Sequence, residues 1–403
     1  MTAHSSRAHA KLSPSSAHRW SVCAGSIRMS EGIENKSSIH ADEGTAAHTL
    51  AERCLRDGRD PIEWLGGHVD IKSGAVCGAR PDGPPEQDGC FEITEEMVDA
   101  VTLYVETVNG YVGVGDEVEY EARLDLTHIP GMAFGTGDCV IYKPATRHLV
   151  VIDLKYGRGV PVDVKANEQL RAYALGAAKR HHNRGVSEVT TVIVQPRCPH
   201  PEGPVRAETI DALDLLEFRI DLEGKALATQ APDAPLVAGD HCKFCPAAAT
   251  CPALRQKVLA VAEMEFGEPP PVDAMTPDDM ARVLRDAGIV RDWIKRVEER
   301  ANDMAKAGSP PTGFKLVASR ATRKWRDETE TLSLLDSMGI DRDDIYVEPK
   351  MKSPAMIEKM LGRKRYPEIA DLVIAKSSGT ILVPVEDPRP PVRADAEDEF
   401  AVP

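Results

Sequence analysis

The pattern of hydrophobic and polar positions in the first half of the chain predicts a sheet. Residues 117–124 alternate between apolar and charged side chains, which is typical of a strand with one buried face. Residues 134–142 and 148–155 are more continuously apolar, and only a short segment separates them, so we expect these two strands to form a hairpin. A further apolar, β-branched stretch at 189–194 predicts a fourth strand.

Apolar residues at helical spacing surround these strands. Helices are predicted over about 42–55, 94–108, 167–180 and 211–228. The intervening segment 66–90 is rich in glycine and proline and is predicted as a loop. Helices that precede, interrupt and follow a run of strands indicate an α/β core, with a central mixed sheet flanked by helices.

A proline-rich segment divides the chain. We predict a disordered N-terminus over 1–11, a first domain over 12–268, a linker over 269–275, an accessory region over 276–385 and an acidic, proline-rich tail over 386–403. The accessory region begins with a long amphipathic helix to about residue 306 and continues as a small α+β region.

The chain is acidic, with a net charge of −15 over 403 residues. This charge argues against a protein that coats nucleic acid through bulk electrostatics. Basic runs at 179–184, 315–326 and 363–365 are local exceptions and are candidate contacts to a phosphate backbone. No apolar run approaches the roughly 18 residues needed to span a bilayer, and no signal peptide is evident, so we expect a cytoplasmic protein.

The third predicted strand ends in a carboxylate and an ammonium group. In the sequence Ile152-Asp153-Leu154-Lys155, the side chains of Asp153 and Lys155 point to the same side of the strand. Such a pair can hold a divalent metal and steady an attacking water or developing negative charge. The alternative is a strand that runs into solvent and ends in an ion pair.

The cysteines are unevenly distributed. Three of the nine form the pattern Cys242-x2-Cys245-x5-Cys251, and thiolates at this spacing can converge on one metal or cluster. The fourth ligand must come from elsewhere in the chain. Cys23 is the natural candidate for a cluster, whereas His241 could complete a zinc site.

Taken together, these motifs resemble those of a known nuclease superfamily. The cysteine pattern resembles the [4Fe–4S] staple of AddB-type and CRISPR-adaptation exonucleases, and the predicted core resembles the RecB-like branch of the PD-(D/E)XK nucleases, in particular a phage and prophage family of that branch. The resemblance spans about residues 12–252 and rests on these motifs: Leu12-Ser13-Pro14-Ser15-Ser16, Gly44-x3-His48, Gly137-Asp138, Ile152-Asp153-Leu154-Lys155 and Gln169-x3-Tyr173.

The resemblance implies a metal-dependent DNA exonuclease that hydrolyses phosphodiester bonds. Asp138 and Asp153 would ligate Mg²⁺ or Mn²⁺, with His48 as a further ligand. The four cysteines would hold a [4Fe–4S] cluster, with Zn²⁺ as the alternative. The implied substrate is DNA with single-stranded or duplex ends, in phage recombination or DNA processing.

The resemblance also assigns roles around the metal. Lys155 would position or activate the attacking water, and Gln169 and Tyr173 would orient the lysine or the DNA backbone. Glu121 would support the site from a neighbouring strand, although Glu119 shares its predicted face and the sequence does not separate the two.

Two functions from other classes stay open at this point. One is a catalytically idle DNA-binding scaffold for recombination, and the other is a zinc-bound protein-interaction module. No Walker phosphate loop is present, so ATP dependence would require a partner such as a helicase. A single-strand annealing protein is a second candidate partner, and the protein could also form an oligomer.

Overall fold

The computed structural model describes residues 12–33, 37–79, 88–266 and 276–316. The described residues up to 266 belong to one compact unit, and those from 276 to 316 belong to a second. The predictions for residues 1–11, the linker 269–275, the tail 386–403 and nearly all of the α+β region lie outside the described residues, as does the basic run at 363–365.

A five-stranded mixed sheet forms the centre of the first unit. Its spatial order is β4 (Glu117–Asp125), β5 (Phe134–Lys143), β6 (His148–Leu154), β7 (Glu188–Val194) and β8 (Val205–Asp211). Strands β4, β5 and β6 are antiparallel, β6 and β7 are parallel, and β8 returns antiparallel to β7. The expected α/β fold with a mixed sheet is therefore confirmed, including the hairpin of β5 and β6.

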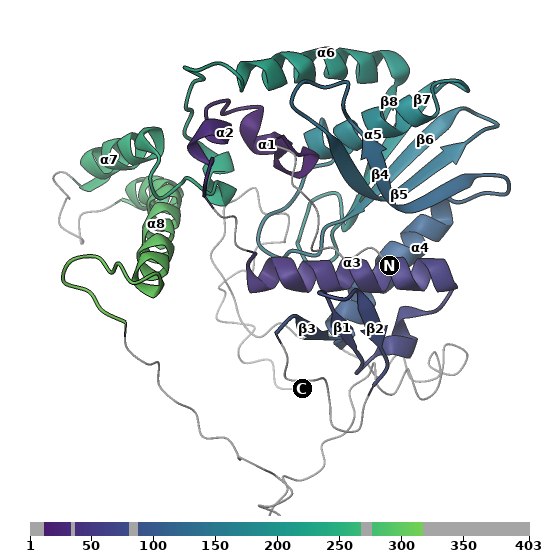
Figure 1. The fold of residues 1–403 in the computed structure, drawn as a ribbon, viewed down its shortest axis with the longest axis horizontal. Helices are drawn as coiled ribbons and strands as arrows, with labels where there is room; N and C mark the ends of the chain where they lie inside the picture. The colour runs from purple at the N-terminus through teal and green to yellow at the C-terminus, as the bar shows by residue number, and fades with distance from the viewer. Residues whose placement is uncertain (1–11, 34–36, 80–87, 267–275, 317–403) are drawn as a thin grey trace, which may run out of the picture. The chain divides into compact units, whose positions relative to one another are not determined.

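Helices cover both faces of this sheet (Figure 1). On one side, α5 (Glu168–Arg180) makes the crossover between the two parallel strands, and α6 (Ala212–Ala228) packs beside it. On the other side lie α3 (Ile39–Asp57) and α4 (Glu95–Tyr111). Every residue of β6 after His148 is buried, because a strand covered on both faces has no solvent-facing side.

Polar side chains cap the first turns of two of these helices. Ser38 accepts the backbone N–H of Ala41 at the start of α3, and Asn167 accepts that of Leu170 at the start of α5. Each bond satisfies one of the backbone donors that a helix leaves unpaired in its first turn. Both caps fix the first turn of a helix that contributes to the site described below.

The prediction of a loop over 66–90 was wrong. This segment contains β1 (His68–Asp70), β2 (Ala75–Cys77) and the first residue of β3 (Cys90–Glu92), which form a second sheet in the order β2-β1-β3. A turn in which the Asp70 carboxylate accepts the Lys72 N–H joins the first two strands. The strands are three residues long, too short to show an alternating pattern. The sequence prediction also missed β8.

Short elements join the N-terminus to the end of the first unit. These are the 3₁₀ turns η2 (Pro14–Ser16) and η4 (Asp240–Phe244), and the helices α1 (Ala17–Trp20), α2 (Ser26–Met29) and α7 (Pro252–Phe266). A further 3₁₀ turn, η3 (Pro61–Trp64), follows α3 and packs on α4. Gly25 N–H donates to the carbonyl of Pro235 at 2.9 Å, so the N-terminal turns pack directly on the cysteine-rich loop.

In the second unit, the described residues form α8 (Pro277–Lys306), as the sequence predicted. In the part of the chain that the structure describes, no helix combines the length and the apolar character that crossing a membrane requires.

Candidate metal-binding and catalytic site

Two neighbouring strands separate at the residues that the sequence singled out. The pairing of β5 with β6 ends at Cys139 and Ile152. Beyond this point the backbone N–H of Leu154 donates to the Asp138 carboxylate at 2.8 Å instead of to a strand. The sheet therefore opens beside Asp138 and Asp153, and side chains from the flanking helices enter the gap.

The first group of side chains at this opening is acidic with one histidine. His48 Nδ1, on α3, lies 3.3 Å from Asp138 Oδ2. One ligand atom from each of His48, Glu121 and Asp138 can be chosen so that all three lie within 4.8 Å of one another. Oxygen and imidazole donors gathered in this way are suited to a divalent cation.

The backbone helps Glu121 to join this group. On β4 and β5, the residues before and after Glu121 pair with those on either side of Asp138, so Glu121 and Asp138 lie opposite each other. The φ of Glu121 is 50°, which is unusual for a residue other than glycine. Glu119, in contrast, forms an ion pair with Arg180. The structure thus separates the two glutamates between which the sequence did not decide. Backbone strain of this kind is common at functional sites.

The second group of side chains centres on Gln169. Lys155 Nζ lies 2.8 Å from Asp153 Oδ2 and donates to Gln169 Oε1 at 2.8 Å. The Gln169 amide nitrogen donates to Asp153 Oδ1 at 3.3 Å and to the Tyr173 hydroxyl at 2.9 Å. Gln169 therefore fixes the relative positions of the carboxylate and the ammonium.

Burial and neighbouring charges shift the pKa values of Asp138 and Asp153 in opposite directions. Burial and the nearby charge of Asp138 raise the pKa of Asp153, although Lys155 opposes the shift. Burial acts in the same direction on Asp138, but His48 and Lys155 outweigh it and lower the pKa of Asp138. Burial would lower the pKa of His48, yet the charge and hydrogen bond of Asp138 raise it to about 9. Carboxylates held at different pKa values are a feature of many catalytic sites.

The cluster of possible metal ligands contains Glu121 in place of Asp153, which the sequence had predicted as a ligand. His48 and Asp138 lie together as expected, and Glu121 completes their group. Asp153 is only 2% exposed and contacts Lys155 and Gln169. All seven predicted residues of the catalytic site nevertheless belong to the two connected groups described here.

Sequence reasoning missed two residues beside this site. Arg197, beyond the end of β7, pairs with Glu43 of α3 and Glu96 of α4 and stacks on the ring of Tyr156, which follows Lys155. Tyr104 of α4 is 2% exposed, and its hydroxyl finds no hydrogen-bond partner among the described residues. Since β6 and β7 are parallel, a charged residue soon after β7 was the available signal for Arg197.

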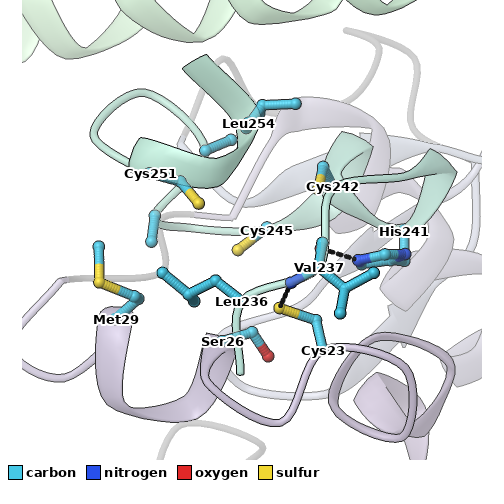
Figure 2. Close-up of a pocket in the computed structure, with 12 residues that line it drawn as sticks. Cys23, Ser26, Met29, Leu236, Val237, His241, Cys242, Cys245, Cys251 and Leu254 are labelled. Carbon is cyan, nitrogen blue, oxygen red and sulfur yellow. Dashed lines mark hydrogen bonds between the residues drawn. The ribbon is translucent and has the colours of Figure 1, made fainter. Parts of the chain in front are cut away.

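The predicted cysteine set forms a second site. Cys23, Cys242, Cys245 and Cys251 line one cavity together with apolar side chains (Figure 2). All four are less than 10% exposed, and each is a free thiol. The backbone N–H of Val237 donates to Cys23 Sγ at 3.3 Å.

A second amide also faces a sulfur of this set. The backbone N–H of Gly239 donates to Cys242 Sγ at 3.4 Å. Amide donors aimed at sulfur are typical of thiolate ligands in metal and iron–sulfur sites, so the residues present fit such a group. His241 also lines the cavity, but its Nε2 donates to the Val237 carbonyl at 2.8 Å. Only its Nδ1 would be left for a metal.

The basic run at 179–184 is largely engaged within the chain. Lys179 pairs with Asp125, Arg180 with Glu119, and Arg184 with Glu117. These contacts neutralise the run and weaken its candidacy as a phosphate-binding surface.

A family model described as "Protein of unknown function (DUF2800)" matches residues 9–390. This match includes both sites and extends through nearly all of the chain. The chain therefore belongs to the DUF2800 family.

Proposed function

We propose that this protein is a metal-dependent deoxyribonuclease with a RecB-like PD-(D/E)XK core, and that it acts as an exonuclease in DNA recombination or processing. The observation that supports this proposal is the connected set of His48, Asp138, Asp153, Lys155 and Gln169 at the point where β5 and β6 separate. An isolated surface ion pair would not need this support from two helices, α3 and α5, and two strands, β5 and β6.

Asp138, His48 and Asp153 would hold Mg²⁺ or Mn²⁺, with Glu121 in the same cluster. When bound, the cation would polarise a phosphate oxygen and offset the negative charge that develops during hydrolysis. Asp153 keeps the ammonium of Lys155 at the site, and Lys155 would orient the attacking water or stabilise the charge on phosphate. Gln169 restricts both side chains, and Tyr173 restricts Gln169.

The cysteine set would hold a [4Fe–4S] cluster with a structural role. It includes one residue from the N-terminal turns and three from the loop before α7, so a bound cluster would join segments that are more than 200 residues apart in sequence. Zn²⁺ is the alternative occupant.

The test is cleavage of end-labelled single-stranded and duplex DNA with Mn²⁺. We expect Asp153→Ala and Lys155→Ala each to lower the rate by about 10²-fold or more. Asp163→Ala and Lys165→Ala are matched controls, because these side chains are 81% and 74% exposed and lie about ten residues away. Both controls should cleave as the wild type does.

Equal activity in all five proteins would refute this assignment of the site. DNA binding without cleavage in the wild type would favour the idle scaffold, and the absence of both would favour a protein-interaction module. Shortening of the labelled strand from its ends would distinguish an exonuclease from an endonuclease.

A further inference from the structure

Arg19 is a buried cation beside the cysteine set. It belongs to α1 and is 9% exposed. Its Nη1 lies 3.9 Å from Cys245 Sγ, 3.1 Å from Ser30 Oγ and 3.4 Å from the Ser26 carbonyl oxygen. Among the residues that the structure describes, no carboxylate lies within ion-pair distance of its guanidinium. Burying a charge without a partner is costly, so this arrangement requires an explanation.

Two other arginines show how this chain ordinarily compensates a poorly exposed guanidinium. Arg197 pairs with two carboxylates, those of Glu43 and Glu96. Arg206 has none, but it donates to three oxygen acceptors at 2.8, 2.8 and 2.9 Å. The oxygen contacts of Arg19 are fewer and longer, and its remaining contact is with a cysteine sulfur.

The charge of that sulfur decides whether Arg19 is compensated. A protonated thiol is neutral and a weak acceptor. A thiolate bound to a metal is a better acceptor, and four thiolates around Zn²⁺ or a [4Fe–4S] core leave the centre with net negative charge. In this buried setting, a cation in contact with one thiolate would interact strongly with the whole centre.

We propose that Arg19 is the counter-charge of an anionic, thiolate-ligated metal centre at Cys23, Cys242, Cys245 and Cys251. This inference rests on the proposed cluster and deepens it, because it assigns a positioning residue that is not a ligand. Arg19 holds Cys245 in the orientation of a ligand and stabilises the negative charge of the occupied site. For an iron–sulfur cluster, it also favours the reduced form, which carries the additional negative charge.

The experiment compares Arg19→Gln, Arg19→Lys and Arg28→Gln in the full chain, purified without oxygen. Arg28 is the matched control, because it lies on the neighbouring helix α2 and is exposed. The measurements are iron, sulfide and zinc content, absorbance near 400 nm, the rate of metal release to a chelator and, for a cluster, the midpoint reduction potential.

We expect Arg28→Gln to match the wild type in every measurement. Arg19→Gln should release its metal about 10- to 100-fold faster, as is typical when a partner of a ligand is removed. With an iron–sulfur cluster, its midpoint potential should fall, because the reduced cluster loses a nearby positive charge. Arg19→Lys keeps the charge and should remain closer to the wild type in both properties.

Two outcomes would overturn the role of Arg19. One is a centre of normal content, release rate and potential in Arg19→Gln. The other is equal loss of metal from Arg19→Lys and Arg19→Gln, which would show that the shape of the guanidinium matters and its charge does not. This comparison applies even if Arg19→Gln folds poorly. A wild-type protein without iron or zinc would instead refute the proposed centre itself.

Discussion

Gly135→Ala should disturb the candidate catalytic site from a position outside it. Gly135 lies on β5 beneath the ring of Tyr173, and an added Cβ would stand 2.8 Å from Tyr173 Cε1 and 2.9 Å from Pro14 Cγ. Carbon atoms in contact are ordinarily separated by about 3.5–4.0 Å. The ring of Tyr173 or the backbone of β5 must therefore move by roughly 0.8 Å.

This displacement has two expected consequences. Overpacking should lower the free energy of unfolding by about 1–3 kcal/mol, which for a domain of this size lowers the melting temperature by about 2–12 °C. Movement of the Tyr173 hydroxyl also loosens Gln169, which holds Asp153 and Lys155. A misplacement of this size can reduce the rate of cleavage by as much as about 10²-fold.

Gly137→Ala is the control for this prediction. It adds the same methyl group two residues along the strand, where the nearest atoms are Leu124 Cδ1 at 3.3 Å and Val140 Cγ2 at 3.5 Å. The assays are thermal unfolding, and cleavage measured well below the melting temperature. Equal effects of the two substitutions would refute the packing argument. Lower stability with full activity for Gly135→Ala would refute the link through Gln169.

Two further predictions concern Arg197 and the buried thiols. Arg197→Gln should lower the free energy of unfolding in urea by about 1.5–3 kcal/mol, because Glu43 and Glu96 lose their shared partner. The control is Arg158→Gln, which replaces an exposed arginine that also pairs with Glu96. An equal or larger loss of stability in Arg158→Gln would contradict this prediction. Burial and the nearby charge of Asp60 raise the pKa of Cys54 to about 12, so its reactive thiolate is scarce at pH 8 and becomes abundant only as the pH approaches that value. Iodoacetamide should therefore modify the partly exposed Cys77 long before Cys54 in the native protein, and equal rates by mass spectrometry would refute the assignment.

Local sequence patterns were enough to predict the elements that have a long, regular hydrophobic periodicity. These elements are the strand over 117–124, the hairpin of β5 and β6, and helices α3 to α6 and α8, all of which follow from local hydrophobic periodicity. It also placed Asp153 and Lys155 on one side of their strand, because this depends only on the two-residue repeat of a strand.

Contacts between side chains from different elements depend on how the chain folds. The short strands β1, β2 and β3, together with β8, are defined by pairing with neighbouring strands, which local hydrophobic patterns do not specify. The pairing of β4 with β5 and the positive φ of Glu121 bring Glu121 to Asp138. A regular alternation would have treated Glu119 and Glu121 as equivalent.

The same limit applies to the charges that surround the two sites. The sequence shows the cysteine spacing and the basic run at 179–184, but it does not show which partners these residues find. Folding pairs the basic run with three acids of β4, while Arg19 reaches a cysteine 226 positions away. Electrostatic interactions act through space and depend on burial, so the arrangement of charges is set by the fold.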